Sequence, residues 1–151
     1  MKKTEAILWS IALPGFAQML SKNYLKGILF IFLEFLINVQ ANFNEIIMLS
    51  FLGQTQAAIE RADFQWLLFY PCLYFFAMWD AYKDAGGGKG DYSFLPLVFA
   101  AFCVTVGTMY SPKVMIFGVL LGPVWLPILS VIPGLLTGYI IRKIILTVQA
   151  A

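Results

Sequence analysis

Long apolar runs alternate along this chain with short polar connections, and the runs set the first expectation for the fold. The four longest cover residues 25–51, 64–82, 93–110 and 114–141. A helix of about 20 apolar residues crosses the roughly 30 Å hydrocarbon core of a bilayer. We therefore predict an all-α fold: a polytopic membrane helix bundle with four transmembrane helices, forming a single integral membrane domain over 1–151.

The first long run, 25–51, contains no proline and carries polar residues at helical spacing. On one continuous helix, at about 100° per residue, four of them form a single stripe: Glu34, Asn38, Asn42 and Glu45. A carboxylate at mid-depth is costly against lipid, so the stripe should face protein or trapped water. No cation lies at the depth of Glu34, which favours a protonated carboxyl group there.

Two interpretations of this stripe remain open. In the first, Glu34 and Asn38 form a proton or cation site in a small transporter or channel component. In the second, Glu34 is a hydrogen-bonding staple, because polar side chains in a membrane also hold helix bundles together. Its expected partners then lie in the N-terminal segment: Gln18, Ser10 or Trp9.

The N-terminal segment 5–20 is apolar but short, and Pro14-Gly15 interrupts it. As a helix it reaches only about 24 Å, and proline removes a backbone donor while glycine permits unusual φ angles. Lysines flank it on both sides. We predict a re-entrant or interfacial segment that begins and ends on the same side of the membrane, and a short true span is the alternative.

The last run, 114–141, contains several helix-breaking and small residues. Its prolines are Pro123, Pro127 and Pro133, and we expect the helix to be kinked or broken there. Its two GxxxG pairs are Gly118/Gly122 and Gly134/Gly138. Small residues four apart let helix backbones approach closely, so the pairs predict packing sites, either inside the bundle or against a membrane partner or second copy.

Charge is scarce, and its placement predicts the orientation. Only 12% of the residues are charged and the mean hydropathy is +0.83, whereas a soluble domain has about 25% charged residues. With both termini in the cytoplasm, Arg61 and Lys113 are the basic residues outside. The other eight are inside: Lys2, Lys3, Lys22, Lys26, Lys83, Lys89, Arg142 and Lys143. Basic residues concentrate in cytoplasmic loops, so we predict a multi-pass protein of a bacterial inner (cell) membrane.

Several classes of function are disfavoured. The chain has no histidine and no nucleophile–base pair, so we expect neither an enzyme nor a metal site. A net charge of +2 gives no electrostatic footprint for nucleic acid. The glycine-rich stretch 83–91 lacks the strand and helix of a phosphate-binding loop, so no cofactor is expected. Cys72 and Cys103 lie inside apolar runs and belong to no metal-binding or redox motif, so we expect both to be buried and inert.

The aromatic and charged residues around the second run have conventional interpretations. Tryptophans and tyrosines are expected to be interfacial anchors. Asp80, Lys83 and Asp84 follow helical spacing at the end of the run, which is typical of a solvated ion-pair cluster. A docking site for a cytoplasmic partner is the alternative.

Two stretches resemble a known family. Residues 13–27 (LPGFAQMLSKNYLKG) are similar to a PGxGQxYxGxxxKG pattern, with matches at Pro14, Gly15, Gln18, Lys26 and Gly27. Residues 79–85 (WDAYKDA) resemble the cytoplasmic end of a later helix in the same proteins. These are small bacterial multipass membrane proteins, loosely related to the TM2-domain group. The resemblance implies location and topology rather than chemistry, since most members have no assigned activity.

The first functional hypothesis is a structural or accessory protein that binds other membrane proteins, or itself, through glycine-lined helix faces. The alternative is a small transporter or channel component that uses the Glu34 stripe and the broken last helix. An enzyme acting on lipid ranks third, because the chain lacks histidine.

Overall fold

The computed structural model describes residues 1–150, and helices make up most of this part of the chain. The all-α class expected from the sequence is confirmed. In order, the elements are α1 (Lys3–Ala12), α2 (Phe16–Leu20), α3 (Tyr24–Gln40), α4 (Phe43–Phe51), α5 (Thr55–Arg61), α6 (Phe64–Leu67), α7 (Tyr70–Asp84), α8 (Leu95–Tyr110), β1 (Met115–Ile116), β2 (Val119–Leu120) and α9 (Gly122–Gln149).

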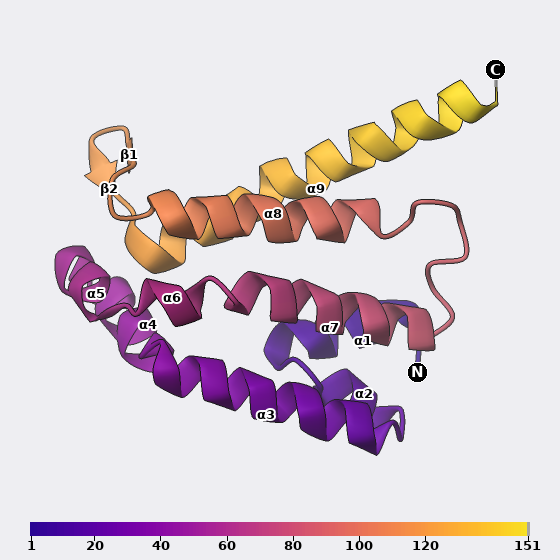
Figure 1. The fold of residues 1–151 in the computed structure, drawn as a ribbon, viewed down its shortest axis with the longest axis horizontal. Coiled ribbons are helices and arrows are strands. Elements are labelled where there is room, and N and C mark those ends of the chain that lie inside the picture. The colour runs from indigo at the N-terminus through magenta and orange to yellow at the C-terminus, as the bar shows by residue number, and fades with distance from the viewer. Residues whose placement is uncertain (151) are drawn as a thin grey trace.

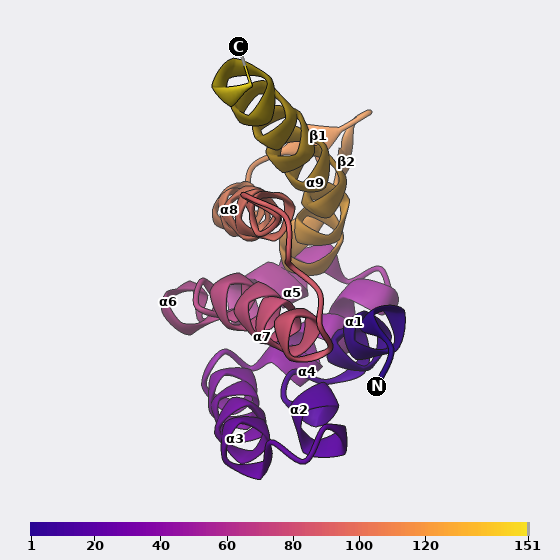
Figure 2. The same cartoon turned by 90° about the vertical axis from the view of Figure 1, so that its right-hand side faces the viewer.

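The long helices lie side by side in a stack (Figure 1). α7 lies between α3 and α8, and α9 packs against α8 and crosses it obliquely. Viewed end-on, α1 and α2 lie beside α7 and α3 (Figure 2). The N-terminus and the last turn of α9 lie at the same end of the molecule, which is also where α3 begins and α7 ends (Figure 1).

The first long run folds as two helices, so the single helix expected over 25–51 was wrong. α3 ends at Gln40, and α4 begins at Phe43 with its axis turned by 65°. Between them Asn42 has a φ of 57°, a left-handed conformation that asparagine tolerates better than most residues. Its Nδ2 donates to the main-chain oxygen of Arg61 at 3.1 Å, so a tertiary contact holds the bend.

The second run, 64–82, divides into α6 and α7. Asp63 caps α6, because its Oδ1 accepts the main-chain N–H groups of Gln65 and Trp66 at 3.0 and 3.3 Å. Pro71 lies in the first turn of α7, where its missing N–H costs no helical hydrogen bond. The third run matches α8 closely.

The last run differs most from expectation. Its first part, 114–121, is an antiparallel hairpin in which β1 pairs with β2. Phe117 and Gly118 form its turn, with φ angles of 52° and 80°. α9 begins only at Gly122, continues through Pro127 and Pro133, and ends at Gln149, so the expected break in the helix was wrong.

The two GxxxG pairs have different roles. Gly118 is in the hairpin turn with open space around it, and Gly122 packs against Thr55 at the start of α9. This pair therefore does not form one helix-packing face, although Gly122 lies where α9 meets α5. In the other pair, a Cβ on Gly134 would lie 2.7 Å from the main-chain oxygen of Phe99. A Cβ on Gly138 would lie 2.5 Å from that of Leu95. This pair brings the backbones of α9 and α8 together inside the bundle.

One helix, α9, is long and apolar enough to cross a membrane. The bent pair α3 and α4 is a second candidate if it counts as one span, and α8 is a shorter apolar helix. Large apolar side chains also cover the outside of the molecule. On α3 their exposed fractions lie between 52% and 85%: Leu25, Ile28, Leu29, Phe32 and Phe35.

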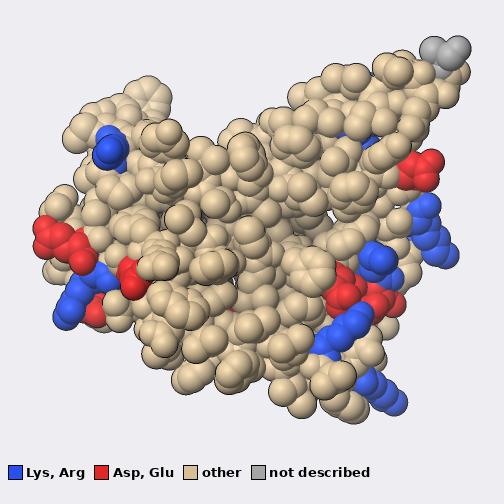
Figure 3. Space-filling model, in the orientation of Figure 1, with Lys and Arg blue, Asp and Glu red and all other residues tan. Residues whose placement is uncertain are grey.

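Charged residues gather at two opposite ends of the face shown in Figure 3, and the belt between them is almost free of charge. One end holds the ion pair between Glu45 and Arg61, with Nε and Oε1 2.9 Å apart. The other holds Lys26 with Asp80 and Asp84.

Candidate functional site

The N-terminal segment forms a hairpin that runs along α7 and back. The Tyr74 hydroxyl, near the middle of α7, donates to the main-chain oxygen of Ile11 at 3.1 Å. Further along, Gln18 Nε2 donates to the main-chain oxygen of Ala77 at 2.9 Å. At the end of α7, the side chain of Asn23 donates to Asp84 at 2.6 Å. The contacts advance toward the charged end of α7, so the segment returns to the end where it began.

The turn of this hairpin depends on Pro14-Gly15. Gly15 has a φ of 93°, a conformation that favours glycine. Its backbone also touches α3, since an added Cβ would lie 2.6 Å from the main-chain oxygen of Gly27. A glycine on each segment therefore allows the hairpin to lie directly on α3.

A polar network fastens the hairpin to both neighbouring helices. Lys26 Nζ, on α3, lies 2.8 Å from Asp80 Oδ1 and 3.2 Å from Asp84 Oδ2. The fully buried Gln18 donates to Asp80 Oδ2 at 3.1 Å. Lys83, expected to belong to this cluster, forms none of its ion pairs in residues 1–150. The cation comes from α3 instead, a pairing that helical spacing on α7 alone does not reveal.

The two stretches that carry the family resemblance meet in this network. Gly15, Gln18, Lys26 and Gly27 come from the first stretch, and Asp80 comes from the second. The residues of the first stretch precede Asp80 by 53 or more positions in the chain. Together, these residues connect the hairpin to α3 and α7.

Glu34 lies in the middle of α3, only 8% exposed. The side chains of Tyr70 and Tyr74, on α7, lie near its carboxyl group. Glu34 Oε2 is buried and has no hydrogen-bond partner within the described residues. Tyr70 is held in place by stacking on Tyr74 and by Phe43, with ring centroids 5.8 and 4.5 Å away.

The partners expected for Glu34 in the N-terminal segment are engaged elsewhere. Gln18 belongs to the network above, Ser10 Oγ donates to the main-chain oxygen of Ala6 at 2.8 Å, and Trp9 packs edge-on against Phe16. The sequence places the tyrosines at the membrane boundary by default, so it did not identify Tyr70 as a neighbour of Glu34. The available signal was the spacing of Tyr70 and Tyr74, which places both on one face of α7.

The rest of the polar stripe lies away from Glu34. Asn38 Nδ2 donates to Asn44 Oδ1 at 3.3 Å. Asn42 caps the bend, and Glu45 pairs with Arg61. These side chains belong to the end of the molecule formed by α4 and α5. The bend has divided the stripe, leaving Glu34 and the tyrosines as a separate polar site.

No protein-family model, curated protein or solved structure matches the chain.

Proposed function

We propose that this chain is a small integral membrane protein of structural or accessory type. α3, α6 with α7, α8 and α9 cross the bilayer, and α1 with α2 forms a re-entrant hairpin. The observation that carries the proposal is the separation of charge to two ends of the bundle, with exposed apolar side chains between them (Figure 3). A soluble monomer rarely exposes such extended apolar surface.

Helix lengths support this arrangement. The part of α9 from Gly122 to Ile141 reaches about 30 Å, the thickness of a bilayer core. α3, with 17 residues, reaches about 26 Å. α4, α5 and the β-hairpin then lie near the far boundary. Both termini lie at the end that carries eight of the ten basic residues, which supports a cytoplasmic location for that end.

The hairpin contacts support re-entry rather than a short span. Its turn is level with Tyr74, about 15 Å along α7 from Asp84, which is half the depth of a bilayer core. The network of Gln18, Lys26 and Asp80 then lies at the cytoplasmic boundary, where water accompanies charged groups. A structural role follows, because these polar groups bind one another.

The accessory role needs a surface other than the one first expected. α8 covers the face of α9 that contains Gly134 and Gly138, so a membrane partner or second copy contacts a different face. The outward face of α3 is available, with Leu25 85% exposed and Phe35 66% exposed. Purification in mild detergent followed by mass measurement tests this role. A fixed partner or a defined oligomer supports it, and a bare monomer contradicts it.

Cysteine labelling tests the topology. In a chain lacking Cys72 and Cys103, single cysteines replace Thr4, Lys89 or Lys113. A membrane-impermeant maleimide should label only Lys113→Cys in intact cells, and all three after permeabilisation. Labelling of Thr4→Cys from outside would contradict the re-entrant hairpin and indicate that the segment is a short span. Equal labelling at Lys89→Cys and Lys113→Cys in intact cells would contradict the whole arrangement.

One observation favours a second function, a proton or cation site at Glu34. A buried carboxyl group with an unpaired oxygen can exchange a proton or hold a cation, and such groups inside membranes often serve transport. Proteoliposomes that leak protons or sodium, with the leak abolished by Glu34→Gln, would support this alternative. If reconstitution of the protein does not change the ion permeability of the liposomes, the result contradicts the proton or cation site and favours the structural role.

A further inference from the structure

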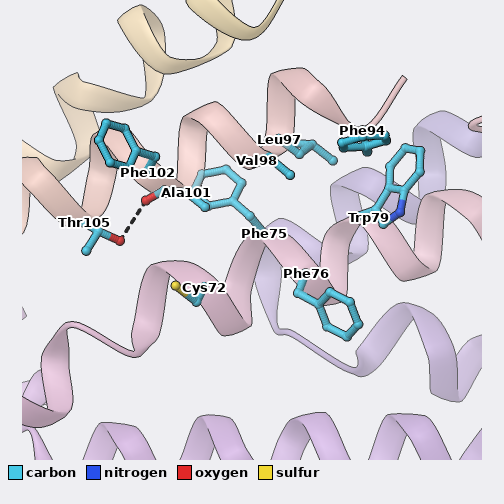
Figure 4. Close-up of a pocket in the computed structure, with 10 residues that line it drawn as sticks. All are labelled: Cys72, Phe75, Phe76, Trp79, Phe94, Leu97, Val98, Ala101, Phe102 and Thr105. Carbon is cyan, nitrogen blue, oxygen red and sulfur yellow. Dashed lines mark hydrogen bonds between the residues drawn. The ribbon is translucent and has the colours of Figure 1, made fainter. Parts of the chain in front are cut away.

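A groove of about 410 Å³ runs between α7 and α8 (Figure 4). One wall is formed by residues of α7 and the other by residues of α8. The lining consists of Cys72, Phe75, Phe76, Trp79, Phe94, Leu97, Val98, Ala101, Phe102 and Thr105. Its single hydroxyl, on Thr105, already donates to the main-chain oxygen of Ala101 at 2.8 Å. The other polar groups of the lining are the indole nitrogen of Trp79 and the thiol of Cys72, and the rest of it is apolar. Cys72 is exposed, so the expectation that both cysteines are buried was wrong.

The shape of the groove suits a chain-like apolar molecule. Its lining extends from Phe94 to Thr105 along α8, about 16 Å, and from Cys72 to Trp79 along α7. Phe76 and Phe102 are 60% and 62% exposed at its open side. If the helices cross the bilayer as proposed above, this side of the groove faces lipid. An acyl chain can then enter the groove from the bilayer.

Basic residues surround one end of the groove. Trp79 and Phe94 meet there, with ring centroids 6.3 Å apart. Lys83 lies one turn beyond Trp79 on the same face of α7. The loop to α8 folds over this end, since an added Cβ on Gly88 would lie 2.6 Å from the Trp79 ring, and Lys89 is the next residue.

These lysines are free to bind an anion. Lys83 and Lys89 are exposed and form no ion pair within the described residues. Two carboxylates are near them in sequence. Asp84 is turned toward Lys26, and Asp91 adjoins Arg142, whose Nε donates to its main-chain oxygen at 3.0 Å. The end of the groove thus has an excess of positive charge.

We propose that this groove binds one acyl chain of an anionic phospholipid, with its headgroup phosphate held by Lys83 and Lys89. The proposal rests on the membrane location argued above and adds a specific lipid partner. The apolar lining selects a hydrocarbon chain, and the lysines select a negative headgroup over a zwitterionic one. The glycine-rich loop has a purpose in this arrangement: it has no bulky side chains, so it can cover the groove end and bring Lys89 to the headgroup.

Fluorescence quenching tests the proposal. The full chain is reconstituted into phosphatidylcholine vesicles that contain a few per cent of brominated phosphatidylglycerol. The signal of Trp79 is obtained by difference from Trp79→Phe. We expect this lipid to quench Trp79 well beyond its share of the bilayer, whereas brominated phosphatidylcholine quenches only in proportion. Changing each lysine to glutamine should reduce the preference about fivefold, as expected for one basic residue at an anionic headgroup.

The matched control for Lys83→Gln/Lys89→Gln is Lys3→Gln/Lys143→Gln, which removes the same charge at the same end of the molecule but away from the groove. Ala101→Phe, which fills the groove and keeps both lysines, should also remove the excess quenching. Equal quenching by the two lipids, or equal loss in test and control variants, overturns the lipid site while the membrane location stands. Absence of quenching by either lipid overturns both.

Discussion

Gly15 and Gly27 face each other across the joint between the N-terminal hairpin and α3. A Cβ on Gly15 would lie 2.6 Å from the main-chain oxygen of Gly27, and one on Gly27 would lie 3.0 Å from that of Gly15. The backbones themselves form this contact. Each glycine is therefore required by the other, which explains how a hairpin of two short helices can be fixed against a neighbouring helix.

The two glycines should respond differently to substitution. Gly15→Ala meets backbone at 2.6 Å and has a φ of 93°, so we expect a loss of about 3 kcal/mol from strain and overpacking. Gly27→Ala chiefly meets the flexible side chain of Met19 and should cost about 1 kcal/mol. Gly53→Ala is the control, because Gly53 also has a positive φ but open space around it. Unfolding in mixed detergent micelles measures all three, and equal losses would contradict the close contact.

The network at the end of α7 should be cooperative but modest in strength. Asp80 accepts from both Lys26 and Gln18, so Asp80→Asn should destabilise the protein by about 1–2 kcal/mol. Asp84→Asn, at a more exposed position, should cost about 0.5 kcal/mol. A double-mutant cycle between Lys26→Met and Asp80→Asn should give a coupling energy near 1 kcal/mol. The exposed pair Glu45–Arg61 is the comparison, and a coupling as small as that pair's would exclude a special role for Asp80.

Gly134 and Gly138 distinguish internal packing from association between chains. Gly134→Leu forces a side chain into the backbone of α8, so we expect a loss of at least 3 kcal/mol of stability with no specific change in oligomeric state. Gly118→Leu is the control for added bulk in open space, because nothing lies within 4 Å of Gly118, and its φ of 80° alone should cost only about 1–2 kcal/mol. Thermal unfolding and size-exclusion with light scattering report the two effects. A stable monomer produced from an oligomer by Gly134→Leu would instead assign this face to association.

The sequence predicted the helical class and the interruption at Pro14-Gly15 because both depend on local signals. Apolar runs and Pro14-Gly15 are visible without tertiary structure. The bend at Asn42 was not predictable in this way, because it is held by the main-chain oxygen of Arg61 from another element. The hairpin at 114–121 was missed because a short apolar stretch has no period that separates strand from helix.

The candidate site was only half predictable for a related reason. Glu34 stands out because it is the single carboxylate in α3. Its neighbours Tyr70 and Tyr74 come from a helix whose register against α3 is set by packing. Likewise, Lys26 can pair with Asp80 only because α3 packs against α7. Sequence spacing identifies which residues are unusual, but partners on other elements depend on how helices pack.

The polar site at Glu34 allows the structural role to be separated from ion transport. If the carboxyl group serves as a neutral polar group packed near Tyr70 and Tyr74, Glu34→Gln should change stability by less than about 0.5 kcal/mol, because glutamine has nearly the same size and remains polar. Glu34→Ala should cost about 2 kcal/mol or more, because it adds a cavity. Unfolding in mild detergent gives these values, and proton flux into proteoliposomes is measured on the same preparations. A flux shown by the unmodified protein and lost in Glu34→Gln at unchanged stability would mean that ionisation of Glu34 matters, and would favour transport over the accessory role.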